Sequence, residues 1–352
     1  MNYSFINVGF PVRFNFLEGA SLALFRVHLV WRMCLVWLVL LVGLSASACL
    51  AAGPAPVQGQ PPAKTKRWRI VLPLDKRIGQ LRLAREKPSS YEVVENVRSI
   101  DLRGEVVLNC ANRYVFYPEY EGTGDLGVLE KFPAELLIAI DARNTESIDD
   151  SALAKFARLK GLRHLILDTC PITDRGLAAV GKMTGLITLQ CMGNGLKGTS
   201  LGALAGLKNL RGLSLGSNHM EHSAFCDIGR LTGLEELTLL NADAHDADVL
   251  ALKPLTNLRK LNLCNNPALT DKGLSVLANF PHLSFLDVAS TGCTNKLVDV
   301  LKKLKEFKVL RIKGDGKSKI SKDLVHRAMP GCQVIEMGYK VDNPEEIFAP
   351  LH

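Results

Sequence analysis

The stretch LNLCNNPALTDKGLSVLANF (Leu261–Phe280) has a near copy about a hundred residues earlier, LILDTCPITDRGLAAVGKM (Leu165–Met183). The Leu-x-x-Leu-x-Leu pattern that belongs to both stretches recurs at steps of 24 residues, with a single step of 25. Self-similarity at a fixed period of this size predicts a solenoid of stacked repeats. The clear copies begin at Leu162, Leu186, Leu210, Leu234, Leu258, Leu283 and Phe307, and weaker ones at Val97, Glu135 and Cys332.

The apolar period changes within each copy. Leu213 and Leu215 alternate around Ser214, which is typical of a short strand. Further along, apolar residues recur three apart, as in Leu201, Leu204 and Leu207, which predicts one face of a short helix. Each copy is therefore predicted to be a strand, a turn and a return helix, and only a stack of copies can bury its apolar face.

Asparagine recurs eight residues after the start of several copies, at Asn194, Asn218 and Asn266, and Cys170 takes the same position. An inward-turning amide there could satisfy loop backbone groups with both its donor and its acceptor. These features identify residues 97–337 as similar to the leucine-rich repeat family. The resemblance implies an α/β solenoid (horseshoe) with a parallel concave β-sheet and short convex helices, a protein-interaction surface, and no cofactor. LTDKGL and ITDRGL resemble the 24-residue repeats of exported planctomycete proteins.

The flanks of the repeats are predicted to act as caps. GQLRLA and YEVVENV both alternate, so residues 68–96 are predicted to form a β-hairpin that covers the first repeat. The tail, residues 338–352, is expected to cover the other end. The step from Val97 to Glu135 is longer than the period, which predicts an aromatic insert at about 104–124.

The N-terminal region predicts export. Residues 33–52 carry no charge, and arginines precede them, so residues 1–52 are interpreted as a signal peptide or an N-terminal membrane segment. Ala46-Ser47-Ala48-Cys49 resembles a bacterial lipobox, in which Cys49 would be lipidated. Translation could start at Met1 or Met33. A Pro-rich linker is predicted at 53–67, and the chain is expected in the periplasm, cell envelope or cell surface.

The net charge of +8 is concentrated at two places. Residues 64–87 and 301–322 each hold nine Lys/Arg against two acids, whereas residues 88–300 hold 20 basic and 25 acidic residues. Such basic runs usually form a solvated surface. They also leave an alternative function open, that of a structural envelope component held to anionic lipid or polymer.

The alternating strand positions on the concave side are the expected partner-binding surface, because an uncovered parallel sheet is otherwise rare. Acids gather at the first repeats and basic residues at the last ones. The candidate residues from these positions are Asp101, Arg103, Asp141, Asp168, Gln190, Met192, Thr238, Asn262, Asp287 and Arg311.

The aromatic insert adds four candidates for partner binding: Tyr114, Phe116, Tyr117 and Tyr120. Tyrosines provide large amphipathic contact area, which suits a binding loop. The alternative is a self-packed lid over the first repeats. Nucleic-acid binding is set aside, because only Arg113 supplies a nearby basic residue among these rings.

No enzyme chemistry is recognisable in the pattern. His219, His222, His245 and Asp246 are the nearest approach to a metal cluster, but a polar residue just before a predicted helix is better explained as a helix cap. No C-x-x-C pair occurs, and the cysteines are expected to be buried with at most one disulfide. The sequence therefore predicts an exported, monomeric, non-enzymatic protein that binds an unidentified protein partner and needs no metal or cofactor.

Overall fold

The computed structural model describes residues 67–337, except 73, 75–76, 88–89, 96, 121–125 and 315–318. The predictions for residues 1–52, the linker up to residue 66, Cys49 and the tail 338–352 fall outside the described residues. Among the described residues, no helix combines the length and the hydrophobicity that a membrane span requires.

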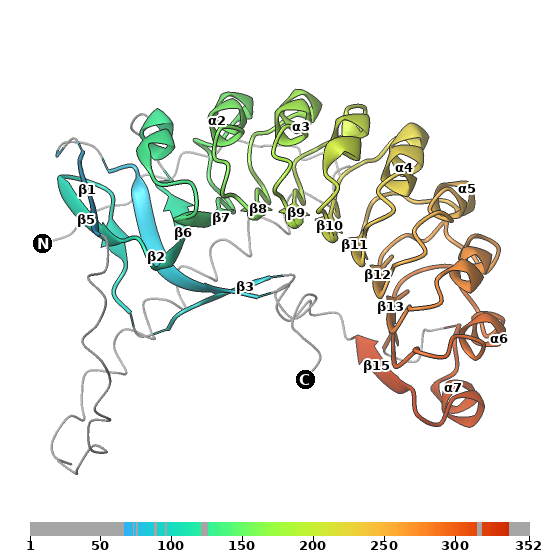
Figure 1. Cartoon of the computed structure of the whole chain (residues 1–352). Helices are drawn as coiled ribbons and strands as arrows, with labels where there is room; N and C mark the ends of the chain where they lie inside the picture. The colour runs from blue at the N-terminus through green and yellow to red at the C-terminus, as the bar shows by residue number, and fades with distance from the viewer. Residues whose placement is uncertain are drawn as a thin grey trace, which may run out of the picture. The chain divides into compact units, whose positions relative to one another are not determined.

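A sheet of parallel strands forms one face of the repeats (Figure 1). It runs in the order β15-β14-β13-β12-β11-β10-β9-β8-β7-β6-β2-β3. Its antiparallel pairs all involve β2 (Gly79–Glu86), which pairs with β6, with β3 (Tyr91–Val93) and with β4 (Ile100–Asp101). Its parallel strands are β6 (Arg113–Pro118), β7 (Leu137–Asp141), β8 (His164–Ile166), β9 (Thr188–Gln190), β10 (Gly212–Ser214), β11 (Glu236–Thr238), β12 (Lys260–Asn262), β13 (Phe285–Asp287), β14 (Val309–Lys313) and β15 (Gln333–Met337).

Short helices cover the opposite, convex side of this sheet (Figure 1). The α-helices are α2 (Asp150–Phe156), α3 (Asp174–Val180), α4 (His222–Gly229), α5 (Asp246–Leu250), α6 (Leu297–Leu301) and α7 (Lys322–Ala328). Three layers use 3-10 helices instead: η1 (Leu126–Lys131), η2 (Leu201–Gly206) and η3 (Gly273–Asn279). One continuous apolar core lies between sheet and helices, and the leucines of the repeat pattern are buried in it.

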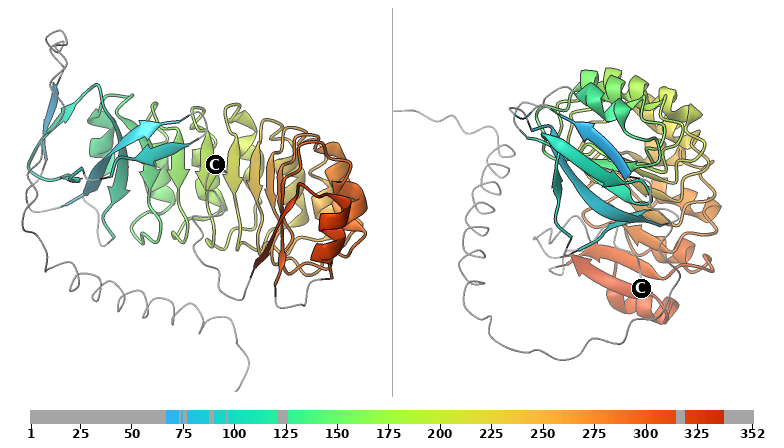
Figure 2. Two further views of the ribbon diagram at one scale, coloured as in Figure 1. Left: turned by 90° about the horizontal axis from the view of Figure 1, so that it is seen from below. Right: turned by 60° about the vertical axis from the view of Figure 1, so that its left-hand side comes forward.

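The register of the sheet follows the sequence period. Leu213 pairs with Leu189 on one side and Leu237 on the other, so like positions of successive layers lie side by side. The views in Figure 2 show the strands stacked as successive layers with the helices on one side. This arrangement is a leucine-rich repeat solenoid, and the predicted fold class is confirmed.

Each layer bends at the third residue after its strand. That residue has a positive φ in seven successive layers: Asn144, Thr169, Gly193, Ser217, Asn241, Asn265 and Ser290. Glycine and asparagine tolerate the left-handed region, whereas a β-branched residue such as Thr169 (φ 56°) is strained there. The bend turns the chain away from the sheet at the same place in every layer.

The asparagines of the column, Asn194, Asn218 and Asn266, each join their layer to the one before it. Asn218 is fully buried, and its Oδ1 accepts the backbone N–H groups of Asn194 and Leu196, both at 3.0 Å. Its Nδ2 donates to the carbonyls of Cys191 (2.7 Å) and Leu215 (2.8 Å). One side chain thus satisfies backbone groups in two layers that the bend leaves without partners.

A second ladder connects the convex helices. The carboxylate of Asp246 accepts from the backbone N–H (2.8 Å) and hydroxyl (2.7 Å) of Thr270 in the next layer. Asp150 makes the same pair of contacts with Thr173. The predicted caps are therefore placed one residue too late: Asp246 is the first helical residue of α5, and the N-cap is His245.

The N-terminal cap contains the predicted β-hairpin together with further strands that the prediction lacked. Strand β2 (Gly79–Glu86) pairs antiparallel with β3 (Tyr91–Val93), with β4 (Ile100–Asp101) and with β6. Strand β1 (Arg67–Val71) pairs antiparallel with β5 (Glu105–Asn109) in a separate two-stranded sheet. The repeat predicted to start at Val97 is thus wrong, because β4 and β5 are antiparallel strands and parallel stacking begins only with β6 and β7. The predicted insert at 104–124 contains β5 and β6, so it is largely strand within the described residues.

The asparagine column should contribute strongly to stability. Asn218→Ala removes the donors and acceptors of five short contacts and leaves buried backbone groups unpaired. We expect the free energy of unfolding to fall by about 3 kcal/mol, as measured by urea unfolding. Asn257→Ala is the matched control, because Asn257 is exposed and donates only to the Thr232 carbonyl; its effect should stay below about 1 kcal/mol. Equal effects of the two changes would contradict the role of the column.

The left-handed residues at the bend predict opposite effects on stability for two substitutions. Thr169 and Ser217 are both exposed and both have positive φ. Thr169→Asn should raise the free energy of unfolding by about 0.5–1 kcal/mol, because it removes a β-branched residue from this region, and Ser217→Thr should lower it by a similar amount. Thermal unfolding of both variants checks the signs, and a stabilising Ser217→Thr would overturn the assignment of strain.

Candidate functional site

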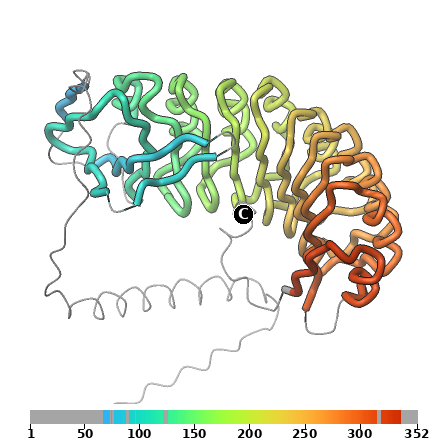
Figure 3. The backbone as a smooth tube through the Cα atoms, turned by 60° about the horizontal axis from the view of Figure 1, so that its bottom comes forward, coloured from blue at the N-terminus to red at the C-terminus, as the bar shows by residue number. Residues whose placement is uncertain are grey.

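The concave face consists of the side chains that alternate toward the inner side of the sheet. Figure 3 traces the backbone of the successive layers that carry them. They form three columns that run across the strands. The first column is Ala139, His164, Thr188, Gly212, Glu236, Lys260, Phe285 and Val309. The central column is Asp141, Ile166, Gln190, Ser214, Thr238, Asn262, Asp287 and Arg311. The third column is Asp168, Met192, Gly216, Leu240, Cys264, Ala289 and Lys313.

The structure brings most of the candidate residues together in these columns, but they are less exposed than the pattern suggests. Every member of the central column except Gln190 is buried, including Thr238, Asn262 and Asp287. Neighbouring strands lie close together, and side chains on the inner side of a curved sheet converge, so each one is covered by the adjacent layers. The accessible part of the face therefore lies mainly in the third column.

Two acids lie at the N-terminal end of the face. Asp141 is buried and forms an ion pair of 2.7 Å with Arg143. Asp168 accepts the backbone N–H of Met192 at 2.8 Å. Burial raises the pKa of Asp168 to about 6, although the Met192 hydrogen bond and Arg143 act in the opposite direction. These carboxylates are held by contacts within the chain.

An acid and a base lie side by side near the C-terminal end of the face. Asp287 and Arg311 are register partners on β13 and β14, with 2% and 8% of their surface exposed. Asp287 accepts the N–H of Ala289 at 3.0 Å, and the guanidinium of Arg311 lies over the Phe285 ring at 5.4 Å from its centroid. Burial raises the pKa of Asp287 to about 6, against the effects of the Ala289 hydrogen bond and Arg311.

A half-buried apolar strip, Met192, Leu240 and Cys264, lies between these two charged ends. Gly216 belongs to the same column, and a Cβ there would come within 2.8 Å of Leu240 Cγ and 3.3 Å of Met192 Cε. The glycine therefore lets these two side chains approach each other across the intervening layer. Burial raises the pKa of the Cys264 thiol to about 12, so this cysteine is a neutral apolar neighbour rather than a nucleophile.

The N-terminal hairpin contacts the first part of the concave face. The ring of Tyr91 on β3 lies 5.2 Å from that of His164 on β8. Ala84, Val115, Ile138 and Ala139 form a small buried cluster on the same side, with Tyr91 packed against it. His164 is fully buried, its Nδ1 contacts the hydroxyl of Thr188 at 2.9 Å, and burial lowers its pKa to about 4. The hairpin thus limits the open face to the layers that follow β8.

Asp101 and Arg103 do not belong to the concave columns, so their assignment there is wrong. Asp101 lies on β4, which pairs with β2 outside the parallel stack. It forms ion pairs with Arg77 (3.3 Å) and Arg103 (4.0 Å). The error follows from the repeat assumed to start at Val97.

The tyrosine candidates need a similar correction. Tyr114 and Phe116 on β6 are buried, with 4% and 0% of their surface exposed, so they are core residues rather than contacts for a partner. Tyr117 is half-buried with Arg82 above its ring at 4.9 Å. Tyr120 is exposed, and its hydroxyl donates to Glu146 at 3.1 Å. The insert is therefore self-packed up to Pro118.

The histidine cluster on the convex side is a set of pairwise contacts. His222 contacts Asp248, and His219 contacts Asp243. Asp248 also accepts the backbone N–H of His245 at 2.8 Å, which makes it part of the start of α5. No group of three metal-binding side chains is found in the part of the chain that the structure describes. The seven cysteines in that part are all free thiols.

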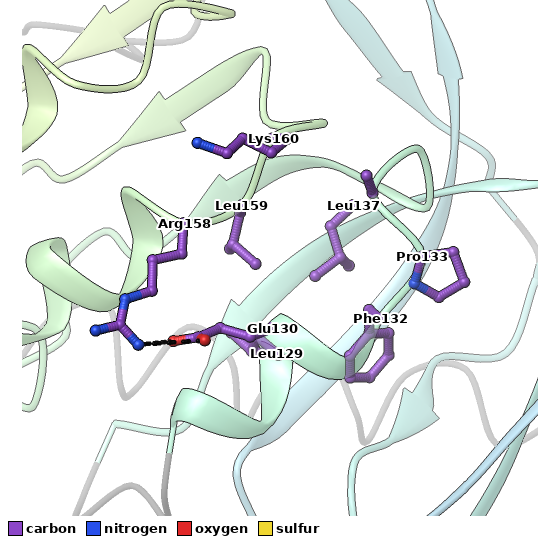
Figure 4. A pocket seen from close by; sticks show the side chains of 9 residues that line it. Leu129, Glu130, Phe132, Pro133, Leu137, Arg158, Leu159 and Lys160 are labelled. Carbon is purple, nitrogen blue, oxygen red and sulfur yellow. Dashed lines mark hydrogen bonds and ion pairs between the residues drawn. The ribbon is translucent and has the colours of Figure 1, made fainter.

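One pocket of about 180 Å³ opens beside η1 (Figure 4). It is lined by Leu129, Phe132 and Leu137, and the ion pair between Glu130 and Arg158 (3.0 Å) spans one side of it. Ligand-binding pockets generally hold at least about 300 Å³. The pocket is thus too small for a typical cofactor or drug-sized substrate.

Sequence reasoning missed the first column and the hairpin contact. The strands already include the residue two positions before each central-column residue, which brings His164 and Phe285 onto the concave face. Extending the alternation two residues back would have found them. Nothing in the sequence of the hairpin indicates that Tyr91 packs on His164, because that contact joins residues far apart in the chain.

Comparison with known proteins gives similarity at the level of structure. No protein-family model matches the sequence, and no curated protein matches it. Two Listeria monocytogenes internalins of known structure are similar to it. Internalin InlF is 18% identical with a TM-score of 0.48, and the match covers 62% of this chain and 59% of that protein. Internalin C2 is 19% identical with a TM-score of 0.45, and the match covers 56% of this chain and 80% of that protein. The chain thus spans about three-fifths of the length of InlF.

The raised pKa of Asp287 predicts a pH dependence of stability. A carboxyl whose folded pKa is about 6 and whose ordinary pKa is 3.8 binds its proton more tightly in the folded state. Its stabilising effect is complete at low pH and is lost as the pH rises from about 4 to 6. Asp287→Asn should therefore gain stability relative to the natural chain across this range, by roughly 3 kcal/mol at pH 7.5.

Urea unfolding between pH 4 and 7.5 measures this difference. Asp299→Asn is the control, because the hydrogen bond from Lys302 lowers the pKa of the exposed Asp299 carboxylate and the substitution should bring no such gain. A difference between Asp287→Asn and the natural chain that does not change with pH would contradict the assignment.

Proposed function

We propose that the chain binds a protein partner across its concave face, in the layers from β9 to β14. The observation that carries this proposal is the half-buried apolar strip of Met192, Leu240 and Cys264 on a parallel sheet face with no described helix over it. Parallel sheets in proteins are normally covered on both faces. An apolar strip with polar residues at both ends is the usual composition of a protein-binding surface.

The strip sets what kind of partner segment fits. Asp168 lies at one end of the third column and Lys313 at the other, so an extended segment would cross the strands with its apolar side chains against Met192 and Leu240. Most of the affinity is expected from these few central contacts, with the charged ends giving orientation. The hairpin contact at His164 would form a wall at the N-terminal side.

The same proposal covers the location of the protein, its lack of enzymatic activity and its monomeric state. The protein acts outside the cytoplasm without an enzymatic activity, as the charge-free residues 33–52 and the resemblance to planctomycete repeats suggest. Binding takes place as a monomer, with anchorage through the N-terminal segment. The alternative, attachment of the basic ends to anionic lipid or polymer, predicts binding that salt removes.

A capture experiment tests the proposal. The full chain serves as bait against a cell-envelope extract, together with a Met192→Glu/Leu240→Glu variant that buries charge in the contact. We expect a protein that the natural chain retains at high salt to be reduced at least about tenfold on the variant. Quantitative mass spectrometry of the retained proteins gives the ratio.

Leu250→Glu provides the matched control, because Leu250 is exposed on α5 at the convex side. The proposed site requires that this variant capture the same protein as the natural chain. If all three baits retain the same material and salt releases it equally, the concave site is wrong and attachment through the basic ends takes its place.

A further inference from the structure

Arg311 is a buried cation whose guanidinium lacks an ion-pair partner among the described residues. Only 8% of its surface is exposed, and its Nε has no hydrogen-bond acceptor. The only other polar side chains in the described region with a buried, unpartnered atom belong to Arg77, His164, Asp174 and Ser214. Of these five, Arg77 forms ion pairs, which leaves Arg311 as the permanent positive charge without one.

The surroundings of Arg311 explain why its charge stays unpaired. Asp287 is its register neighbour, yet the Asp287 carboxylate accepts the N–H of Ala289 and forms no ion pair with the guanidinium within 4 Å. The guanidinium lies over the face of Phe285 on the first column instead. Glu336, the nearest acid along β15, forms its ion pair with Lys322 on α7. The Cys264 thiol also interacts with Asp287 and Arg311, and Lys313 lies on the same face of β14, two residues after Arg311.

Buried charges in proteins are normally paired, because an unpaired charge loses its hydration without compensation. A guanidinium presents donors in a planar fork that matches a carboxylate, and it keeps its charge under all ordinary conditions. We propose that Arg311 and the Phe285 ring form a subsite for an acidic side chain of the partner segment. This inference rests on the proposed function, since the same concave face must bind the segment.

The neighbouring acid makes the subsite selective. Asp287 lies beside Arg311 on the same column, so a second negative charge on the partner at that position would be repelled. The pair therefore favours a single carboxylate over a group with two negative charges, such as a phosphate. It also fixes the register: the partner's acid lies opposite β14, and its apolar residues extend from there toward Leu240 and Met192.

Matched synthetic peptide pools test the subsite. One pool contains twelve-residue peptides with random positions around a fixed Glu, and the other has Gln in its place. Acetylated and amidated ends leave no terminal charge. The labelled full chain is applied to both immobilised pools, as are the Arg311→Met and Arg311→Lys variants. Arg327→Met is the control, because Arg327 is exposed on α7.

The natural chain and Arg327→Met should be retained on the Glu pool about tenfold or more above the Gln pool, as expected for a charge-assisted hydrogen bond. Arg311→Met should lose this preference, while its unfolding midpoint shows that it is folded. Arg311→Lys should keep only part of it, because lysine has no planar fork. The strip variant Met192→Glu/Leu240→Glu is applied to the same pools. If the natural chain is retained equally on both pools and the strip variant on neither, the carboxylate subsite is overturned but concave-face binding stands. If the strip variant is retained on both pools as strongly as the natural chain, the proposed function itself is overturned.

The acid that binds Arg311 could come from a partner or from the chain's own C-terminal tail. The variant Glu345→Gln/Glu346→Gln, which removes two acids of the tail, distinguishes the two sources. If the acid comes from a partner, this variant should prefer the Glu pool to the same extent as the natural chain. If instead the tail variant is retained more strongly on the Glu pool, and its unfolding energy falls by the same amount as that of Arg311→Met, the acid comes from the chain itself. That result would overturn the proposal of a partner ligand.

Discussion

Everything in this solenoid depends on how each layer satisfies its backbone where the strand ends and the chain bends away. The left-handed residue at that place turns the chain, and the turn leaves N–H and C=O groups inside the stack without sheet partners. Asn218 and Asn266, each the residue after the left-handed one, have no exposed surface and bond to groups in their own layer and the one before it. Because one amide spans two layers, the layers must stack in a single register, and the register in turn aligns the concave side chains into columns.

The ladder is not uniform, and its exceptions are informative. Cys170 takes the asparagine position in the first clear copy, and its thiol contacts the carbonyl of Ala142 at 2.9 Å. Ala242 takes it in another layer, where Asn266 of the following layer accepts the Ala242 N–H at 3.1 Å. The layer of Ala242 lacks an amide of its own but is still joined to the next layer by Asn266, and the aspartate–threonine ladder between the convex helices supplies a second connection. The stack tolerates single gaps because each layer is tied to its neighbours at more than one point.

The sequence predicted the repeated layers, but it predicted less of the region before the first parallel layer. Period, alternation and the asparagine position follow from local spacing, so the sheet, the convex helices and the inward amides were predictable. The alternation also predicted the β2–β3 hairpin of the N-terminal cap. The rest of the cap was not predictable, because the pairing of β1 with β5 and the packing of Tyr91 on His164 join segments that share no pattern. The same limit affected the candidate site. Asp168, Met192 and Arg311 were placed on the concave face by spacing alone, whereas burial of Thr238 and Asn262 depends on how closely neighbouring side chains converge.

The central functional claim is that the strip between β9 and β14 is the contact surface for a partner. Photo-crosslinking in living cells tests it directly, because the reaction captures whichever protein touches the strip. A benzoylphenylalanine residue replaces Leu240 in one full-length chain and Leu250 in another, so that the reactive group lies on the concave strip or on convex helix α5. We expect a discrete crosslinked product from position 240 and none from position 250. A product from position 250 alone, or equal products from both, would contradict the assignment of the concave face.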